Sequence, residues 1–317
     1  MSHSRDKTVP IVQCRQVQKT YRSLWTRRRG AVCALQGVSL EVTEGTIIGL
    51  IGPNGAGKTT FLSLIAGLIF PTAGDIRVGG HRPRSRQARR LLGYVPEFPV
   101  FLARYSARAV LRYHAALHGL SRPDVDTEAE RLLEQVKLTE YAGRAVGGFS
   151  QGMRQRLALA VALVGKPTLL LLDEPSNGLD PIGVIELRRV LTELQQAGAT
   201  VIVSSHRLGE LEKLTKDFVF LDKGRIVRFG DKAASEQGRC LRVDCLPGGA
   251  AVTDGAVASH RLLEVTDTTL RIGVSGVEDV PEVVGSLVQA GVRITGVGLE
   301  TEDVEQAFVR LCQERAS

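Results

Sequence analysis

The sequence Gly52-Pro53-Asn54-Gly55-Ala56-Gly57-Lys58-Thr59-Thr60 fits the phosphate-binding pattern G-x-x-x-x-G-K-[ST] at every fixed position. The apolar run 46–51 before it predicts a buried strand. Apolar residues at helical spacing over 61–69 predict a helix that ends before Pro71. Glycines let backbone N–H groups point inward, and a helix N-terminus adds partial positive charge, so this segment is suited to a triphosphate. A glycine-rich turn that only caps a helix remains the alternative for this segment alone.

Chemistry-bearing side chains follow the ends of two predicted strands. Lys58 would reach the β- and γ-phosphates, and the Thr59 hydroxyl would ligate Mg²⁺. The run Leu169–Leu172 ends in Asp173 and Glu174, where Asp173 is placed to hold Mg²⁺ and Glu174 to orient and deprotonate the attacking water. The alternative is a pair of exposed turn carboxylates.

Three further positions carry weaker signals. His206 follows the apolar strand 200–204 and could touch a γ-phosphate, although a lone histidine is usually structural. Tyr21 precedes the phosphate loop and could stack on an adenine ring, or be an ordinary strand-end tyrosine. Ser150 opens an apolar helix, which predicts either a second anion-binding helix start or simple capping.

Length and composition bound the class of protein. The chain has 317 residues, 43% of them apolar and 24% charged, which predicts about two globular domains. No apolar run reaches the roughly 18 residues of a membrane span, and the polar N-terminus lacks a secretion signal. The five cysteines show no metal spacing, and their odd number predicts reduced thiols in a cytosol, with Cys240 and Cys245 packed in a strand.

The net charge of +7 is concentrated in two places. Arginines crowd the segment Arg82 to Arg112, and a second run is Arg27-Arg28-Arg29. These residues are either a solvated face or a surface that attracts anionic lipid headgroups or an acidic partner. Nucleic acid is the third possibility, but aromatic residues do not alternate regularly with these charges, as a base-stacking site requires.

The chain order predicts an α/β domain followed by a smaller one. Residues 1–10 are expected to be disordered, 11–232 to form the nucleotide-binding domain with a helical lobe at about 98–165, and 239–317 to form an α+β domain. Within these bounds the patterns predict strands at 11–17, 32–42, 74–80, 93–97, 218–222, 225–229, 240–245, 270–274 and 292–296, and helices at 126–136, 181–196, 280–290 and 302–312.

With these motifs in this order, residues 9–230 resemble the ATP-binding subunit of an ABC transporter. The resemblance implies a P-loop NTPase core sheet with an antiparallel β subdomain, ATP and Mg²⁺ as ligands, and catalysis by Glu174, His206 and Lys58. It also implies a head-to-tail homodimer, in which Lys58 of one subunit and Ser150 and Gly152 of the other bind the same nucleotide. Asp180, in the turn 177–181, would lie at that dimer interface.

The resemblance further implies a transmembrane permease as partner and a peripheral location on the cytoplasmic face of the membrane. The family signature usually reads Leu-Ser-Gly-Gly-Gln, whereas this chain has Phe149-Ser150-Gln151-Gly152-Met153. Glu97 stands where the family has a glutamine that links Mg²⁺ and water to the membrane subunit, which puts the details of coupling in doubt. Both departures are similar to those of the drug-, polysaccharide- and lipid-export branch, including subunits tied to copper-enzyme maturation and gliding.

The competing function is that of a non-transport ABC-type ATPase acting on nucleic acid or ribosomes. DNA-maintenance relatives carry a long coiled coil between the phosphate loop and the signature, but here about 90 residues without sustained heptads separate Lys58 from Ser150. Translation-factor relatives carry two cassettes, and this chain has one. We therefore expect no nucleic-acid partner. The tail 239–317 is expected to stabilise a dimer, with a regulatory ligand site as the alternative.

Overall fold

The computed structural model describes residues 10–21, 31–231, 239–247, 260, 262–274 and 276–301. The chain divides into two compact units, residues 1–229 and 230–317. The disorder expected before Pro10, the arginine run 27–29 and the helix expected at 302–312 lie outside the described residues.

A six-stranded sheet forms the centre of the first unit. Its strands β3, β6 and β7 are buried along their whole length, as expected for parallel strands that are covered on both faces. The pairs β5–β6, β6–β7, β7–β3 and β3–β8 are parallel, so their carboxyl ends meet at one edge. The spatial order is β5 (Leu92–Val95), β6 (Leu169–Leu172), β7 (Thr200–Ser205), β3 (Ile47–Ile51), β8 (Asp217–Asp222) and β9 (Arg225–Asp231).

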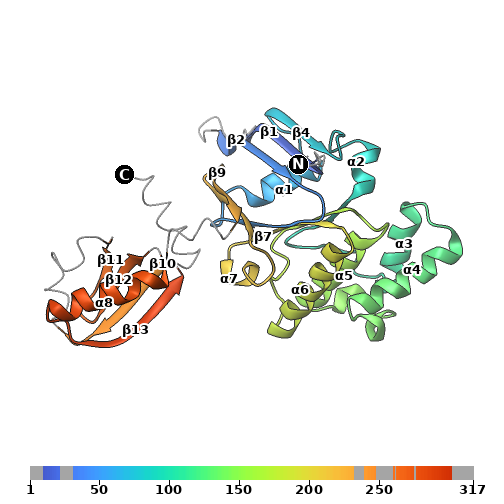
Figure 1. The fold of residues 1–317 in the computed structure, drawn as a ribbon. Helices are drawn as coiled ribbons and strands as arrows, with labels where there is room; N and C mark the ends of the chain where they lie inside the picture. Colours follow the sequence, from blue (N-terminus) through green and yellow to red (C-terminus); the bar gives the residue numbers. More distant parts are fainter. Residues whose placement is uncertain are drawn as a thin grey trace, which may run out of the picture. The chain divides into compact units, whose positions relative to one another are not determined.

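An antiparallel sheet of three strands lies beside this core (Figure 1). Its order is β2 (Val32–Val42), β1 (Val12–Tyr21) and β4 (Ala73–Val78). Strand β1 continues four residues past its predicted end at Val17. The pattern breaks there because Gln16 adopts a left-handed φ of 49° and shifts the register, and its N–H donates to Ser39 Oγ at 2.9 Å.

Helices cover the sheets and build a separate lobe (Figure 1). Helices α3, α4 and α5 contact one another and form the lobe, whereas α1 packs Phe61, Leu62 and Ile65 into the main core. The short helix α2 was not predicted, because among its six residues Ala88 alone is buried and no apolar repeat exists. The helices are α1 (Lys58–Ile65), α2 (Arg86–Leu91), α3 (Ala107–Leu117), α4 (Arg122–Gln135), α5 (Gln151–Leu163), α6 (Pro181–Gln196) and α7 (Leu208–Leu211), with 3₁₀ turns at Thr139–Tyr141 and Val146–Gly148.

The second unit has its own sheet and its own core. Helix α8 (Val280–Gln289) packs Val283 and Leu287 against the sheet. The strand expected from Val292 begins two residues later, because the Val292 N–H donates to Leu287 O and caps α8 instead. The sheet order is β11 (Leu262–Val265), which was not expected, then β12 (Thr269–Val274), β10 (Arg239–Cys245) and β13 (Ile294–Thr301), with a 3₁₀ turn at Val277–Asp279.

Across the described ranges, none of the helices has the length and apolar character needed to cross a bilayer.

Candidate nucleotide-binding and catalytic site

The loop 52–57 connects the carboxyl end of β3 to the first residue of α1. Gly57 has a φ of 108°, and a β-carbon there would lie 2.6 Å from Ala34 O. A β-carbon on Gly52 would lie 2.1 Å from Leu221 O. Both positions therefore require glycine, and the loop presents the N-terminus of α1 at the edge where the parallel strands end.

Lys58 is the first residue of α1 and is buried under this loop. Its Nζ donates to Gly52 O at 2.7 Å and lies 3.2 Å from Glu174 Oε1. The ammonium group is therefore held between a carbonyl oxygen and a carboxylate oxygen. The structure thus brings the lysine of the phosphate loop into contact with the carboxylate that follows β6.

Glu174 and His206 meet because β6 and β7 are parallel neighbours. His206 Nδ1 lies 2.8 Å from Glu174 Oε2. The backbone of Glu174 is left-handed, with φ 47°, and its N–H donates to Ser204 Oγ at 2.9 Å. Both carboxylate oxygens of Glu174 therefore face a basic side chain, which fixes the orientation that a general base needs.

Asp173 is fully buried beside this pair. Its Oδ1 accepts a hydrogen bond from Ser204 Oγ at 2.7 Å, while Oδ2 has no hydrogen-bond partner among the described residues. A buried carboxylate oxygen without a donor is costly unless a cation or water satisfies it. The oxygen chemistry fits Mg²⁺, which is commonly bound by one or two carboxylates together with substrate phosphates. Thr59 follows Lys58 on α1 and is exposed.

Glu97 follows β5 and lies next to the same acidic group. Asn177 Nδ2 donates to its Oε1 at 3.4 Å. Burial, together with the negative charges of Asp173 and Glu174, raises the pKa of Glu97. Glu97 therefore lies close enough to Asp173, the predicted magnesium ligand, and to Glu174, the predicted general base, for its charge to affect both carboxylates.

Sequence reasoning missed three side chains of this site. Ser204 connects Asp173 to the Glu174 backbone, and Asn177 contacts Glu97. Tyr94 is half-buried near Asp173, and burial followed by that carboxylate's charge raises the pKa of its phenol. A usable signal existed only for Ser204, because a serine at the end of an otherwise apolar strand is unusual.

Tyr21 ends β1 close to the start of α1. Its hydroxyl lies 3.5 Å from Thr60 Oγ1, and the residue is 43% exposed. Lys19 Nζ lies 5.0 Å from the ring centroid. The ring is therefore accessible beside the phosphate loop, and its stacking on adenine stays a prediction.

The signature segment lies at the N-terminus of α5. Ser150 Oγ accepts from the Met153 N–H at 3.2 Å and caps the helix. Gln151 and Gly152 pack near Gly178, and Asp180 caps α6 through the Gly183 N–H at 2.8 Å. No hydrogen bond or ion pair within the described residues joins Ser150–Met153 to Lys58, Asp173 or Glu174. The roles predicted for these residues and for Asp180 involve a second subunit and remain predictions.

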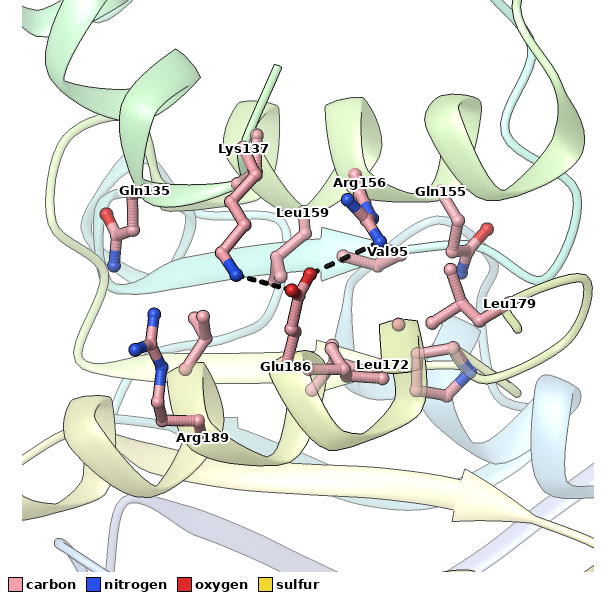
Figure 2. Close-up of a pocket in the computed structure, with 15 residues that line it drawn as sticks. Val95, Gln135, Lys137, Gln155, Arg156, Leu159, Leu172, Leu179, Glu186 and Arg189 are labelled. Carbon is pink, nitrogen blue, oxygen red and sulfur yellow. Dashed lines mark hydrogen bonds and ion pairs between the residues drawn. The ribbon is translucent and has the colours of Figure 1, made fainter. Parts of the chain in front are cut away.

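A separate pocket lies between α5 and α6 (Figure 2). Glu186 of α6 pairs with Lys137 and, at 3.2 Å, with Arg156 of α5. Gln155 is 3% exposed, and neither its Oε1 nor its Nε2 has a partner among the described residues. The cavity volume of about 30 Å³ has room for one or two ordered waters, which would satisfy this amide. This pocket is too small for a nucleotide.

Comparison with known proteins reveals many relatives of one kind. A protein-family model described as ABC transporter matches residues 35–177. The daunorubicin resistance ATP-binding protein DrrA3 of Streptomyces coeruleorubidus is 35% identical over 294 residues, which cover 90% of this chain and 93% of that protein. The bacitracin transport ATP-binding protein BcrA of Bacillus licheniformis is 38% identical over 64% of this chain and 66% of its own length. The uncharacterized ABC transporter ATP-binding protein YxlF of Bacillus subtilis is 41% identical, but the chain spans only 64% of it.

Solved structures agree with the sequence relatives. A structure described as an ATP-binding subunit of an ABC transporter is 29% identical, with a TM-score of 0.63, and the match covers 71% of this chain and 92% of that one. The cassette MJ0796 bound to ADP and Pi shares the fold at 24% identity and a TM-score of 0.64, over 69% of this chain and 98% of its own.

Proposed function

This chain belongs to the family of ABC transporter ATP-binding proteins, and from that premise we propose that it hydrolyses ATP to drive a separate permease that exports a small molecule. The observation that carries the catalytic part is the contact of Glu174 with both Lys58 and His206. The export part rests on relatives named for daunorubicin resistance, bacitracin transport and linearmycin resistance.

We assign separate roles in phosphate binding, proton transfer and magnesium binding to the residues of this site. The N–H groups of loop 52–57, the N-terminus of α1 and Lys58 bind the β- and γ-phosphates. Glu174 accepts the proton of the attacking water, and His206 orients that carboxylate and reaches the γ-phosphate. Thr59 and Asp173 would hold Mg²⁺, which would neutralise charge on the phosphate oxygens.

Two subunits are needed to complete the proposed site. The Ser150 end of α5 is a helix N-terminus suited to an anion, yet among the described residues no hydrogen bond or ion pair joins it to Lys58 of the same chain. A head-to-tail homodimer would bring Ser150 and Gly152 of one subunit to the phosphates held by Lys58 of the other. Closing and opening of this dimer would move the permease between two states.

The catalytic part is tested by Glu174→Gln. We expect hydrolysis to fall by about 10²-fold or more, because the general base is lost, while ATP still binds. Phosphate release and binding of a fluorescent ATP analogue are measured in parallel. Glu193→Gln, on the exposed side of α6, is the matched control and should hydrolyse normally. Hydrolysis by Glu174→Gln at the wild-type rate would refute the assignment.

The partner is tested by purification of the tagged chain from membranes of its host in mild detergent. A polytopic membrane protein in stoichiometric complex supports the proposal, and its family would narrow the exported compound. Recovery with ribosomes or DNA, or alone, would contradict it.

A further inference from the structure

A surface remote from the phosphate loop combines exposed arginines with exposed apolar side chains. It consists of Leu68, Phe70, Arg82, Arg84, Arg86, Arg89 and Arg90, and we call it the basic–apolar patch. Leu68 and Phe70 follow the C-terminal end of α1, opposite the end that bears Lys58. No role in ATP binding or hydrolysis involves these residues.

The apolar residues of the patch, which follow α1, and its arginines, which lie in and before α2, are adjacent in space. Three of the seven patch residues, Phe70, Arg82 and Arg84, line one groove of about 350 Å³. The Arg84 guanidinium lies 4.3 Å from the centre of the Phe70 ring. Gly67 has no room for a β-carbon, because it would lie 2.9 Å from Pro83 O. The loop after α1 and the arginine-bearing loop therefore pack directly together.

The positive charge of this patch is not neutralised by its surroundings. All five arginines are exposed, and none makes an ion pair with a carboxylate in the described part of the chain. Asp75, which lines the same groove as Arg82 and Arg84, is paired with Arg77 at 2.8 Å. On α2, the buried Ala88 faces the protein, so Arg86, Arg89 and Arg90 share the outer face.

The apolar side chains are held outward by a fixed backbone. Leu68 is 59% exposed and Phe70 62% exposed. The Leu68 N–H donates to Ser63 O at 2.9 Å, and Lys19 Nζ donates to Phe70 O at 2.8 Å. Because the backbone hydrogen bonds hold this turn, the two large side chains cannot be buried by a simple rearrangement of it, and they are available to a partner.

We propose that the basic–apolar patch binds anionic phospholipid headgroups at the membrane surface, with Leu68 and Phe70 entering the interfacial region. Clustered arginines are attracted to an anionic leaflet, and neighbouring apolar side chains add burial at the headgroup–acyl boundary. Nucleic acid fits less well, because Phe70 alone cannot form the series of stacking platforms that single strands require. This ATPase subunit would thus contact the bilayer directly, in addition to its permease.

The test is co-sedimentation of the full chain with vesicles that contain no protein. Vesicles of phosphatidylcholine with about one third phosphatidylglycerol should pellet the chain at about 0.1 M salt, and phosphatidylcholine alone should not. Arg86→Gln/Arg89→Gln/Arg90→Gln should weaken binding by about tenfold or more. Leu68→Ser/Phe70→Ser should weaken it even at low salt, because the apolar contribution is not screened.

The matched control removes three exposed basic side chains elsewhere, in the variant Arg122→Gln/Lys213→Gln/Lys216→Gln. It should bind vesicles nearly as well as the wild type, and all variants should melt and bind ATP normally. Equal weakening in patch and control variants would overturn the proposal in favour of net charge alone. Failure of the wild type to bind anionic vesicles, or patch-dependent binding of an oligonucleotide more tightly than vesicles, would overturn it as well. None of these outcomes depends on ATP hydrolysis or on a permease, so the proposed function is tested separately.

Discussion

Lys58 lies between two groups that compete for its charge, the carboxylate of Glu174 and the phosphates that the loop is shaped to bind. The Nζ–Oε1 distance of 3.2 Å is that of a buried ion pair. The Coulomb attraction within such a pair is stronger than within a surface pair, because its surroundings screen it less. The affinity for nucleotide therefore depends on how strongly Glu174 retains the lysine.

We expect Glu174→Gln to bind ATP several-fold more tightly than the wild type, besides losing hydrolysis. The neutral amide no longer competes for Lys58 and no longer repels the triphosphate. Titration with a fluorescent nucleotide measures the change, with Glu193→Gln as the control. Unchanged or weaker binding would show that the Lys58–Glu174 pair does not oppose nucleotide binding.

Glu97 gives the site a pH-dependent stability. The pKa of Glu97 is raised in the folded chain, so the folded state favours the protonated carboxyl. This preference adds to the free energy of unfolding at low pH, and the added stability is lost as the pH rises through the folded pKa. We expect Glu97→Gln to melt at a higher temperature than the wild type at pH 7, and the difference to vanish toward pH 4. Melting curves across this range test it. Glu140→Gln, an exposed carboxylate, should show no such trend.

At the scale of elements, Glu186 connects the helical lobe to the core. It lies on α6 and pairs with Arg156 of α5 and with Lys137, which follows α4 (Figure 2). These pairs are partly exposed, so solvent screening limits their contribution.

We expect Glu186→Gln to lower the free energy of unfolding by about 1 kcal/mol at low salt, and by less at high salt. Denaturant unfolding at both salt concentrations measures this. The control Glu193→Gln breaks one exposed ion pair on the same helix, which joins Glu193 to Arg189 one helical turn before it. This control should change the free energy of unfolding by less than about 0.5 kcal/mol. Equal losses in the two variants would mean that the lobe is not held by Glu186.

Substitutions of Asp180 can distinguish its role as a helix cap from its predicted role at a dimer interface. Its Oδ1 caps α6 through the Gly183 N–H. Asparagine also caps helices well, whereas alanine loses about 1 kcal/mol. Asp180→Asn should therefore keep the melting temperature, and Asp180→Ala should lower it. If Asp180 also lies at a dimer interface, both variants should weaken ATP-dependent dimerisation, as measured by size-exclusion chromatography of the Glu174→Gln background. Normal dimerisation of both would leave capping as its function.

Sequence patterns predicted those elements that are determined by consecutive residues. The strand–loop–helix around Lys58, the apolar strand before Asp173 and the strand before His206 are each written in consecutive residues. The contacts of Ser204 with Asp173, and of Asn177 with Glu97, join residues about 30 and 80 positions apart and follow from strand order, which no local pattern specifies. Helix α2 is a local element and was still not predicted, because a short arginine-rich helix has no apolar periodicity.

At the scale of the whole molecule, each unit carries its own hydrophobic core. We expect a chain that ends after Asp231 to fold cooperatively and to bind ATP within about twofold of the full chain, because the nucleotide residues all lie in the first unit. Circular dichroism melting and nucleotide titration check this. Loss of cooperative unfolding in the truncated chain would show that the first unit requires the second.

The left-handed backbone of Glu174 carries a cost that its side chain offsets. A residue with a β-carbon at φ 47° is strained by about 1–3 kcal/mol, which glycine would relieve. Glycine would also leave the buried Lys58 ammonium without its carboxylate partner, and breaking a buried ion pair typically costs about 3–5 kcal/mol. A search for heat-stable variants of this chain should therefore retain the carboxylate at position 174, even under conditions in which ATP hydrolysis gives no advantage.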